Sequence, residues 1–495
     1  MAADVCLVLE GTYPFVAGGV SAWTHQLIQA HSDLSFHLVC LMPPGADQVR
    51  RYELPGNVVG MEVVTVQELA PGRRHARGLA GFLGQLEEPL SLFDDARGDE
   101  GLESLLKALE GQPVERLGAE TLLNSRPAWQ ILLRRYEARY PDASFLDFFW
   151  SWRALMGGLF SVLLAPMPRA AVYHAVSTGY AGLFLARARQ QTGRPALLTE
   201  HGIYTNERRI EIALADWLYE VPESGMSVEE RPSQLREMWV NTFLSYSRCT
   251  YAAADEIITL FEGNQAFQLQ DNAPEEKLRV IPNGVDPTRF AQLESRPHPP
   301  TMALIGRVVP IKDIKTFLRA VAMVRDRIPD ARALVMGPTD EDPEYFQECQ
   351  DMVAYLGVGD AVTFTGGVRL EDYLPEVDVI VLTSISEGQP LVILEAGSAS
   401  IPTVATDVGA CRDIIEGDGR EAEDPLPPGG VITPLSNPSA TADGVANLLQ
   451  DRARYQQCSQ AIRERIRRHY DKRDLDAVYR QLYDHYRMAP GRGPG

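Results

Sequence analysis

The sequence predicts an α/β protein with two parallel-sheet domains. Its 495 residues are too many for a single hydrophobic core. Short aliphatic, strand-like runs alternate with helical patterns along the chain, which is typical of βα units on parallel sheets. A proline-rich stretch at residues 296–300 interrupts this alternation, which restarts at residue 302. We therefore expect a hinge at residues 286–301 and a doubly wound sheet on each side of it.

The first domain is predicted to span residues 1–295. Its strands are expected at residues 5–9, 36–41, 171–173, 196–199, 256–260 and 278–281. Residues 67–165 break the alternation because helical patterns dominate there, and we interpret them as an insertion. An aromatic cluster in this insertion either forms its buried core or offers a docking surface for a membrane partner: Phe145, Phe148, Phe149, Trp150 and Trp152.

The second domain is predicted to span residues 296–472. Its strands are expected at residues 302–305, 333–336, 361–364, 379–382 and 403–405. Apolar residues from Ile314 to Ile328 recur at helical spacing and predict one amphipathic helix. The chain is mostly helical from Asn437 onward, and residues 473–490 are expected to form a final helix.

The composition is that of an ordinary folded globular protein and argues against one class of ligand. Hydrophobic residues make up 45% of the chain and the formal net charge is −20. An extended nucleic acid is disfavoured as a ligand because its phosphates need a basic face, although a local basic pocket for a small diphosphate stays compatible. The six cysteines show no metal-binding spacing and several lie in apolar runs, so we expect buried free thiols in a reducing compartment.

The sequence contains no segment that we interpret as a signal peptide or a spanning helix. The longest uncharged stretch, residues 154–168, is short and is interrupted by glycine and proline. We expect a cytoplasmic protein, which a partner could recruit to the inner membrane.

Two glutamates separated by seven residues are the most informative feature of the chain. Glu387 lies in the loop after the strand predicted at residues 379–382, and Glu395 lies about one turn into the following apolar helix. Ligands of open parallel sheets bind at this end of the strands. Helix amides can face a phosphate and carboxylates accept hydrogen bonds from hydroxyls, so the pair suggests a ligand that joins an anion to a polyol. By spacing alone, two solvated carboxylates are the alternative.

Other polar and glycine residues also follow predicted strands. Arg307 and Lys312 lie after the first strand of the second domain, where two cations indicate a diphosphate or, alternatively, an ordinary basic surface. Gly18 and Gly19 precede a helix in the first domain, where they either let the backbone approach a phosphate or form a plain tight turn.

Two histidines follow strands of the first domain. His201 lies at the end of the strand predicted at residues 196–199, which favours a ligand contact over a core role. A metal ligand is disfavoured because no second histidine or carboxylate stands at ligand spacing. His174 is either an acceptor-side residue or a structural one.

These segments resemble glycosyltransferase family 4, whose members are retaining enzymes with the GT-B fold of two Rossmann-like domains. The resemblance is carried by residues 384–397 and 304–313, and it extends to the glycine pair and to residues 199–204. In that family the first glutamate contacts the donor sugar and the second holds the ribose hydroxyls, which implies these roles for Glu387 and Glu395. Gln389 and Pro390 depart from the common family pattern, and this departure bears on the choice of donor.

The resemblance implies a complete set of site residues. The catalytic residues would be His201, Glu387, Arg307 and Lys312. The donor-binding residues would be Gly18, Gly19, Arg307, Lys312, Val368, Arg369, Glu387, Gly388, Gln389, Pro390, Leu391, Val392 and Glu395. Val368 would offer backbone contacts to a uracil ring that Arg369 covers. The final helix would cross back onto the first domain, as it does in GT-B enzymes.

The implied reaction moves a hexosyl or N-acetylhexosaminyl unit from a UDP-sugar to a growing glycan with retention at the anomeric carbon. No cofactor or metal is expected, because the two cations would neutralise the diphosphate. A role in polymer export would need an inner-membrane polysaccharide synthesis and export complex as partner. Two other classes stay open: a UDP-sugar epimerase of the same fold, and a catalytically silent subunit that binds sugar nucleotides.

Overall fold

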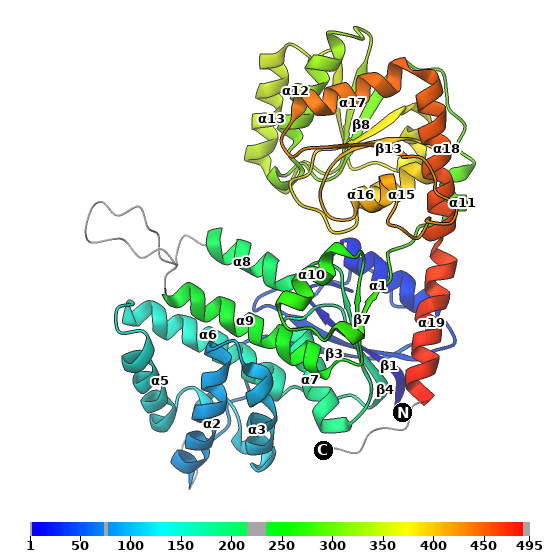
Figure 1. Cartoon of the computed structure of the whole chain (residues 1–495). Coiled ribbons are helices and arrows are strands. Elements are labelled where there is room, and N and C mark those ends of the chain that lie inside the picture. The colour runs from blue at the N-terminus through cyan, green and yellow to red at the C-terminus, as the bar shows by residue number, and fades with distance from the viewer. Residues whose placement is uncertain (1, 74–77, 215–233, 489–495) are drawn as a thin grey trace. The chain divides into compact units, whose positions relative to one another are not determined.

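The computed structural model describes residues 2–73, 78–214 and 234–488. The chain divides into two compact units (Figure 1). The first comprises Met1–Val280 and Tyr479–Gly495, and the second comprises Ile281–Val478. The proline-rich stretch at residues 296–300 therefore lies inside the second unit, and the chain crosses between the units before it.

The first unit is built on a parallel sheet of seven strands in the order β3-β2-β1-β4-β5-β6-β7. The strands are β1 (Ala3–Glu10), β2 (Phe36–Met42), β3 (Val58–Thr65), β4 (Ala170–Ala175), β5 (Ala196–Glu200), β6 (Glu256–Thr259) and β7 (Leu278–Val280). Strand β3 was not predicted from the sequence, because it lies at the sheet edge, is only partly buried and lacks the continuous apolar run of the central strands.

Helices cover this sheet and fill the predicted insertion. They are α1 (Gly19–Ala30), α2 (Leu79–Asp94), α3 (Gly98–Glu110), α4 (Ala119–Leu122), α5 (Arg126–Arg139), α6 (Phe145–Leu163), α7 (Tyr180–Thr192), α8 (Tyr204–Leu214), α9 (Gln234–Ala253) and α10 (Gly263–Gln270). Figure 1 shows α2, α3, α5 and α6 gathered beside α9. Residues 74–77 of the predicted insertion lie outside the described residues.

The insertion shares one hydrophobic core with the rest of the first unit. Phe82, Leu105 and Phe148 pack in the same cluster as Val39 of β2 and Leu183 of α7. Of the aromatic cluster, Phe148 and Trp152 are buried, whereas Trp150 is 59% exposed. The cluster therefore contributes to the core, while one of its rings faces solvent.

The second unit holds a parallel sheet of six strands in the order β10-β9-β8-β11-β12-β13. The strands are β8 (Thr301–Ile305), β9 (Arg332–Met336), β10 (Val362–Gly366), β11 (Val379–Leu382), β12 (Thr403–Thr406) and β13 (Gly430–Thr433). The helices are α11 (Pro287–Ala291), α12 (Ile314–Arg325), α13 (Pro343–Leu356), α14 (Leu370–Tyr373), α15 (Leu391–Ser398), α16 (Cys411–Glu416), α17 (Pro438–Gln450) and α18 (Arg452–His469). The edge strand β13 was not predicted from the sequence.

The last helix, α19 (Lys472–Met488), begins in the second unit, and its residues from Tyr479 onward belong to the first. Residues 489 and 490 of the helix predicted here lie outside the described residues. All six cysteines are buried and free, as predicted. Within the described ranges, no helix combines the length and the apolarity needed to cross a membrane.

Each sheet contains one point where the strand order reverses. In the first sheet β1 lies between β2 and β4, and in the second sheet β8 lies between β9 and β11. Neighbouring parallel strands end at the same edge, and at a reversal the two following loops turn to opposite sides and leave a crevice for ligands. The loops after β1 and β4, and those after β8 and β11, are therefore the places to look for a site.

Candidate functional site

The loops that follow β8 and β11 are joined by hydrogen bonds in the second unit. The Thr383 hydroxyl donates to the carbonyl oxygens of Lys312 and Asp313, at 3.0 Å each. The Ile385 N–H donates to the Ile311 carbonyl at 2.9 Å. Residues about seventy positions apart in the chain are thereby fixed next to one another.

This arrangement brings Lys312 and Glu387 together. The Lys312 ammonium forms an ion pair with Oε1 of Glu387, which also accepts a hydrogen bond from the Ser384 hydroxyl at 2.6 Å. The two charged side chains are only 19% and 13% exposed. Partial burial strengthens their attraction relative to a surface pair, so an incoming anion must compete with Glu387 for Lys312.

Arg307 has a different environment. It pairs with Glu341, and both side chains are about half exposed, at 54% and 49%. An exposed pair of this kind contributes little to stability, so Arg307 can exchange Glu341 for another anion at small cost. The structure therefore joins two of the predicted residues, Lys312 and Glu387, and leaves Arg307 on a solvent-facing loop.

Glu395 lies in α15, which starts directly after the loop of Glu387. Burial raises the pKa of its carboxyl, and the neighbouring charges of Arg289 and Glu371 act on it in opposite directions. Arg289 and Glu371 form an ion pair of 2.6 Å. Arg369 is exposed and precedes α14. A backbone hydrogen bond and the Arg289 guanidinium lower the pKa of Glu371, and the charge of Arg369 acts in the same direction. The predicted base-side loop and Glu395 thus belong to one electrostatic neighbourhood, to which Arg289 adds a cation that the sequence did not indicate.

Other predicted donor-binding positions occupy the turn before α15. Leu391 and Val392 form its first turn and are half-buried, and Pro390 precedes them. The amide of the Gln389 side chain is bonded to the backbone of Asn283. The backbone of Gln389 is therefore the part of this residue that a ligand would contact, and its donor-binding role stays a prediction.

The first unit places Gly18 and Gly19 at the start of α1, where helix amides lack helical partners. A Cβ added at either glycine would meet no atom within 4 Å. Packing therefore does not require glycine at these positions, and the space above the helix start is open to a ligand.

The two histidines have different surroundings. Both ring nitrogens of His174 are engaged, with the Tyr483 hydroxyl at 2.8 Å and the Thr199 hydroxyl at 2.9 Å, and its side chain is fully buried. His174 therefore has the structural role. His201 packs edge-on against Trp23 with ring centroids 4.5 Å apart, and its Nε2 has no hydrogen-bond partner among the residues described. Burial lowers the pKa of His201 to about 4, so its imidazole is neutral at pH 7.

His201 lines a pocket of about 480 Å³ at the carboxyl edge of the first sheet. Aromatic side chains form much of its wall: Tyr180, Tyr204, Trp239 and Phe243. Glu10 is the last residue of β1 and is half-buried, and its carboxylate accepts hydrogen bonds from the Tyr204 hydroxyl at 2.7 Å and the Ala181 N–H at 3.0 Å. Thr12 and Ser177 line the same pocket, and in the described part of the chain their hydroxyl oxygens have no partner.

Glu10 and its pocket were missed by the sequence analysis. Glu10 opens the segment that ends in Gly18 and Gly19, but its neighbours Tyr204 and Trp239 come from helices far along the chain. A polar residue that ends a buried strand is a signal that could have been noticed.

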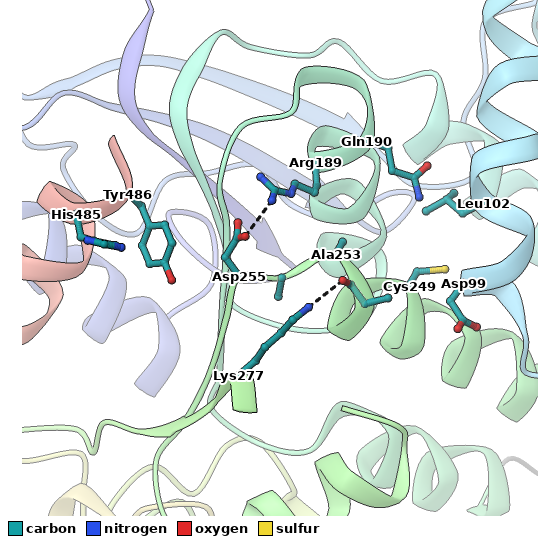
Figure 2. A pocket seen from close by; sticks show the side chains of 12 residues that line it. Asp99, Leu102, Arg189, Gln190, Cys249, Ala253, Asp255, Lys277, His485 and Tyr486 are labelled. Carbon is teal, nitrogen blue, oxygen red and sulfur yellow. Dashed lines mark hydrogen bonds and ion pairs between the residues drawn. The ribbon is translucent and has the colours of Figure 1, made fainter. Parts of the chain in front are cut away.

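A larger hollow of about 640 Å³ lies at the opposite edge of the first sheet, where β6 and β7 begin (Figure 2). Arg189 and Asp255 form an ion pair across it at 2.9 Å, and the Lys277 ammonium donates to the Ala252 carbonyl at 3.1 Å. Both cations are bound by groups of the protein itself: Arg189 by Asp255 and by the Gly193 carbonyl after α7, and Lys277 by a carbonyl at the end of α9. We therefore assign this hollow a structural role.

Replacing Glu200 by Gln is expected to flatten the pH dependence of stability. Glu200 is buried next to His201, and burial raises its pKa from 4.5 to about 7 even though Tyr251 and Gln268 donate hydrogen bonds to it. Between pH 4.5 and about 7, Glu200 is protonated in the folded state and ionised in the unfolded state. Its contribution to stability is therefore complete below pH 4.5 and is lost as pH rises through about 7. The loss in the unmodified protein is roughly 3 kcal/mol. Urea unfolding across this range would contradict the expectation if both proteins lost stability equally.

Comparison with known proteins assigns the fold and the family. A solved structure of Anabaena Alr3699/HepE in complex with UDP superposes with a TM-score of 0.60 at 15% identity, covering 97% of this chain and 99% of that one. A sucrose-phosphate synthase from Thermosynechococcus elongatus superposes with a TM-score of 0.57 at 18% identity, covering 97% and 98%. The two Rossmann-like domains and these neighbours place the chain in the GT-B class, which confirms the predicted fold. Residues 3–276 match the family described as a domain of unknown function (DUF3492), and because this match spans more than half of the sequence, the chain belongs to that family.

The second unit carries a further match. Residues 299–451 match the family described as glycosyl transferases group 1. The MMP alpha-(1->4)-mannosyltransferase of Mycolicibacterium hassiacum is 27% identical over 259 residues, which cover 50% of this chain and 56% of that protein. A D-inositol 3-phosphate glycosyltransferase of Streptomyces griseus is 31% identical over 202 residues, which cover 35% and 43%. The chain therefore spans about half the length of these relatives.

Proposed function

We propose that the chain is a glycosyltransferase that uses a nucleotide sugar. The observation that carries this proposal is the partly buried Lys312–Glu387 pair at the carboxyl ends of β8 and β11, with Glu395 in the next helix. One cation for a phosphate and two carboxylates for hydroxyls are what a sugar joined to a nucleoside diphosphate requires. The group 1 match covers this part of the chain and supports the proposal.

The donor that we propose is a UDP-sugar carrying a hexosyl or N-acetylhexosaminyl unit. A structural neighbour contains UDP, but a relative from Mycobacterium tuberculosis that is 29% identical over 202 residues is named as GDP-mannose-dependent. The base is therefore the first property to measure. In our proposal Arg369 and Val368 flank the base, Glu395 accepts hydrogen bonds from the ribose, and Lys312 and Arg307 bind the diphosphate.

We propose transfer with retention at the anomeric carbon by a same-face displacement. The bond from that carbon to the diphosphate oxygen breaks, the acceptor oxygen bonds to the same face, and the acceptor proton passes to the departing phosphate. In the second unit, Arg307 and Lys312 stabilise the charge that develops on the leaving group, and Glu387 holds the sugar hydroxyls. For Gly18, Gly19 and His201 of the first unit, the family resemblance implies contacts with the same diphosphate and sugar. Neither a protein nucleophile nor a metal is required in this proposal.

The pocket that contains Glu10 is our proposed place for the acceptor. A sugar ring has apolar faces and a hydroxyl rim, which suits aromatic walls combined with a carboxylate and hydroxyl groups. The hydroxyls of Thr12 and Ser177 have no hydrogen-bond partner among the described residues, so they are available to such a ligand.

A more specific assignment rests on resemblance alone. Residues 11–15 and 200–204, together with the helical insertion, resemble PelF, the cytoplasmic glycosyltransferase of the Pel exopolysaccharide system of bacteria. We propose on this basis that the acceptor is a growing exopolysaccharide and that a membrane-bound synthesis and export complex recruits the chain.

The proposed donor site is tested by titration calorimetry. UDP-glucose, UDP-galactose, both UDP-N-acetylhexosamines, GDP-mannose and ADP-glucose are each titrated into the protein, with and without EDTA. We expect binding restricted to UDP compounds, no effect of EDTA, and a loss of at least about tenfold in affinity for Glu395→Ala. A hydrogen bond to a charged group contributes about 1.5–3 kcal/mol, and about 1.4 kcal/mol corresponds to a tenfold change.

Glu344→Ala is the control, because Glu344 is likewise a helix glutamate of the second unit but lies in the exposed first turn of α13, whereas Glu395 is partly buried about one turn into α15. Preference for GDP or ADP compounds would overturn the donor assignment, and no binding of any compound would favour the silent subunit. Analysis of the products then separates a transferase from an epimerase, since only the first makes a new glycosidic bond.

A further inference from the structure

The side chain of Gln389 joins the loop of Glu387 to a distant backbone segment. Its Oε1 accepts a hydrogen bond from the Asn283 N–H at 2.6 Å, and its Nε2 donates to the Asn283 carbonyl at 3.2 Å. The two residues are 8% and 9% exposed. Both polar atoms of the amide are therefore committed to one backbone position, and breaking the contact would leave buried groups without partners.

Asn283 lies where the chain has just entered the second unit, which begins at Ile281. Two residues later, the Val285 N–H donates to the Tyr470 carbonyl and the Lys472 N–H donates to the Val285 carbonyl, at 2.9 Å each. Lys472 is the first residue of α19, the helix along which the chain leaves this unit after Val478. The entering and leaving segments are thus tied together close to both crossings.

The contact between these two segments leaves no room for a side chain. A Cβ at Gly284 would lie 2.6 Å from the Cα of Lys472 and 2.9 Å from its backbone nitrogen. Backbone atoms cannot move aside as a flexible side chain can. A displacement of Asn283 is therefore passed on to the start of α19.

The other anchors of the Glu387 loop lead elsewhere. The Thr406 hydroxyl donates to the Ser384 carbonyl at 2.6 Å, and the Ala410 N–H donates to the Gly388 carbonyl at 2.8 Å. Ile385 is bonded to the loop after β8. As far as the structure describes the chain, Gln389 alone connects residues 383–390 by a hydrogen bond to residues 281–286.

We propose that Gln389 is a positioning residue that couples the nucleotide-sugar loop to the two connections between the units. The coupling rests on the proposed function, because the ligand that engages Lys312 and Glu387 is the proposed donor. Glu387 is two residues from Gln389, so a ligand that repositions Glu387 also moves the amide that holds Asn283. Through the Gln389 side chain, ligand binding at the Glu387 loop thereby changes the order of the two segments at which the chain enters and leaves the second unit.

The test is hydrogen–deuterium exchange on the full chain, alone and with UDP or, separately, GDP. Gln389→Met keeps the length of the side chain and removes both hydrogen bonds. Asn283→Ala is the matched control, because it leaves the backbone N–H and carbonyl to which Gln389 bonds. The Asn283 Oδ1 that this control removes has no partner among the described residues. Gln389→Glu keeps the acceptor for the Asn283 N–H and serves as a second variant.

Without ligand, we expect the Asn283 amide to exchange at least about tenfold faster in Gln389→Met than in the unmodified protein. With nucleotide, residues 384–390 should be protected in every variant. Residues 281–286 and 470–474 should gain protection in the unmodified protein and Asn283→Ala, partly in Gln389→Glu, and not in Gln389→Met. In transfer assays, Gln389→Met should lower kcat about tenfold and change the donor KM by less than about twofold.

Equal nucleotide-dependent protection of residues 281–286 in Gln389→Met and the unmodified protein would overturn the coupling while leaving the proposed function intact. The coupling would also fail if Asn283→Ala lost that protection as Gln389→Met does. If neither nucleotide protects residues 384–390 in the unmodified protein, the proposed function falls and the coupling falls with it.

Discussion

Replacing Glu387 by Gln is expected to lower sugar transfer by roughly a hundredfold, which corresponds to about 3 kcal/mol of lost transition-state stabilisation. The same change should leave nucleotide diphosphate binding intact or tighten it. Glu387 is the partly buried counter-ion of Lys312, and a neutral amide at that position no longer competes with a phosphate for the ammonium. Initial rates and calorimetric titration with the nucleoside diphosphate measure the two effects separately.

Glu341→Gln provides the matched control for this prediction. Glu341 is the counter-ion of Arg307, but this pair is about half exposed and is therefore expected to contribute little. Its loss should change both transfer and binding by less than about twofold. If Glu387→Gln weakened nucleotide binding as strongly as transfer, Glu387 would act as a ligand of the nucleotide rather than as a competitor for Lys312.

Replacing Gly409 by Ala is expected to disrupt the loop of Glu387 and to destabilise the protein. Gly409 has a φ of +52°, and a Cβ there would lie 2.2 Å from the Gly388 carbonyl oxygen and 2.3 Å from that of Glu387. The loop must move to relieve this contact with backbone atoms. We expect a loss of roughly 3 kcal/mol in unfolding free energy, of which about 1 kcal/mol comes from the positive φ alone, and a loss of at least about tenfold in nucleotide affinity.

Gly419→Ala separates strain from contact. Gly419 has a φ of +85°, but a Cβ added there would meet no atom within 4 Å. Urea unfolding of this variant should therefore show only the cost of the positive φ, and its nucleotide affinity should be unchanged. If the two alanine variants lost the same unfolding free energy and bound nucleotide equally well, the close contact between Gly409 and the Glu387 loop would not be needed for nucleotide binding.

The site residues of the second unit were easier to predict from the sequence than those of the first. Lys312 and Glu387 could be assigned to loops after strands because a strand followed by glycine or proline is a local pattern. The partner of Arg307 could not be found in this way, since Glu341 lies in the loop after β9 and meets Arg307 only once the sheet has formed. Gln389 showed the same limit: its sequence position suggested a ligand contact, but the fold directs its amide to Asn283.

In the first unit, the sequence placed His174 and His201 alike, both at strand ends. Their different roles depend on tertiary contacts, because Tyr483, from the last helix, and Thr199 occupy both nitrogens of His174. No helix partner takes the Nε2 of His201 within the described chain. The position of Glu10 at a strand end could have been noticed in the sequence, but the aromatic wall of its pocket could not, since that wall comes from three separate helices.

By itself, the sequence determined that this chain is an α/β protein of two parallel-sheet domains, and it placed glycines, cations and carboxylates at the carboxyl ends of strands. These properties follow from periodicity and from residues adjacent in the chain, which act over one or two turns of structure. Only the tertiary structure decided which loops meet. The placing of β8 beside β11, which are separated in the chain by β9 and β10, pairs Lys312 with Glu387, because strand order is set by packing among elements distant in sequence.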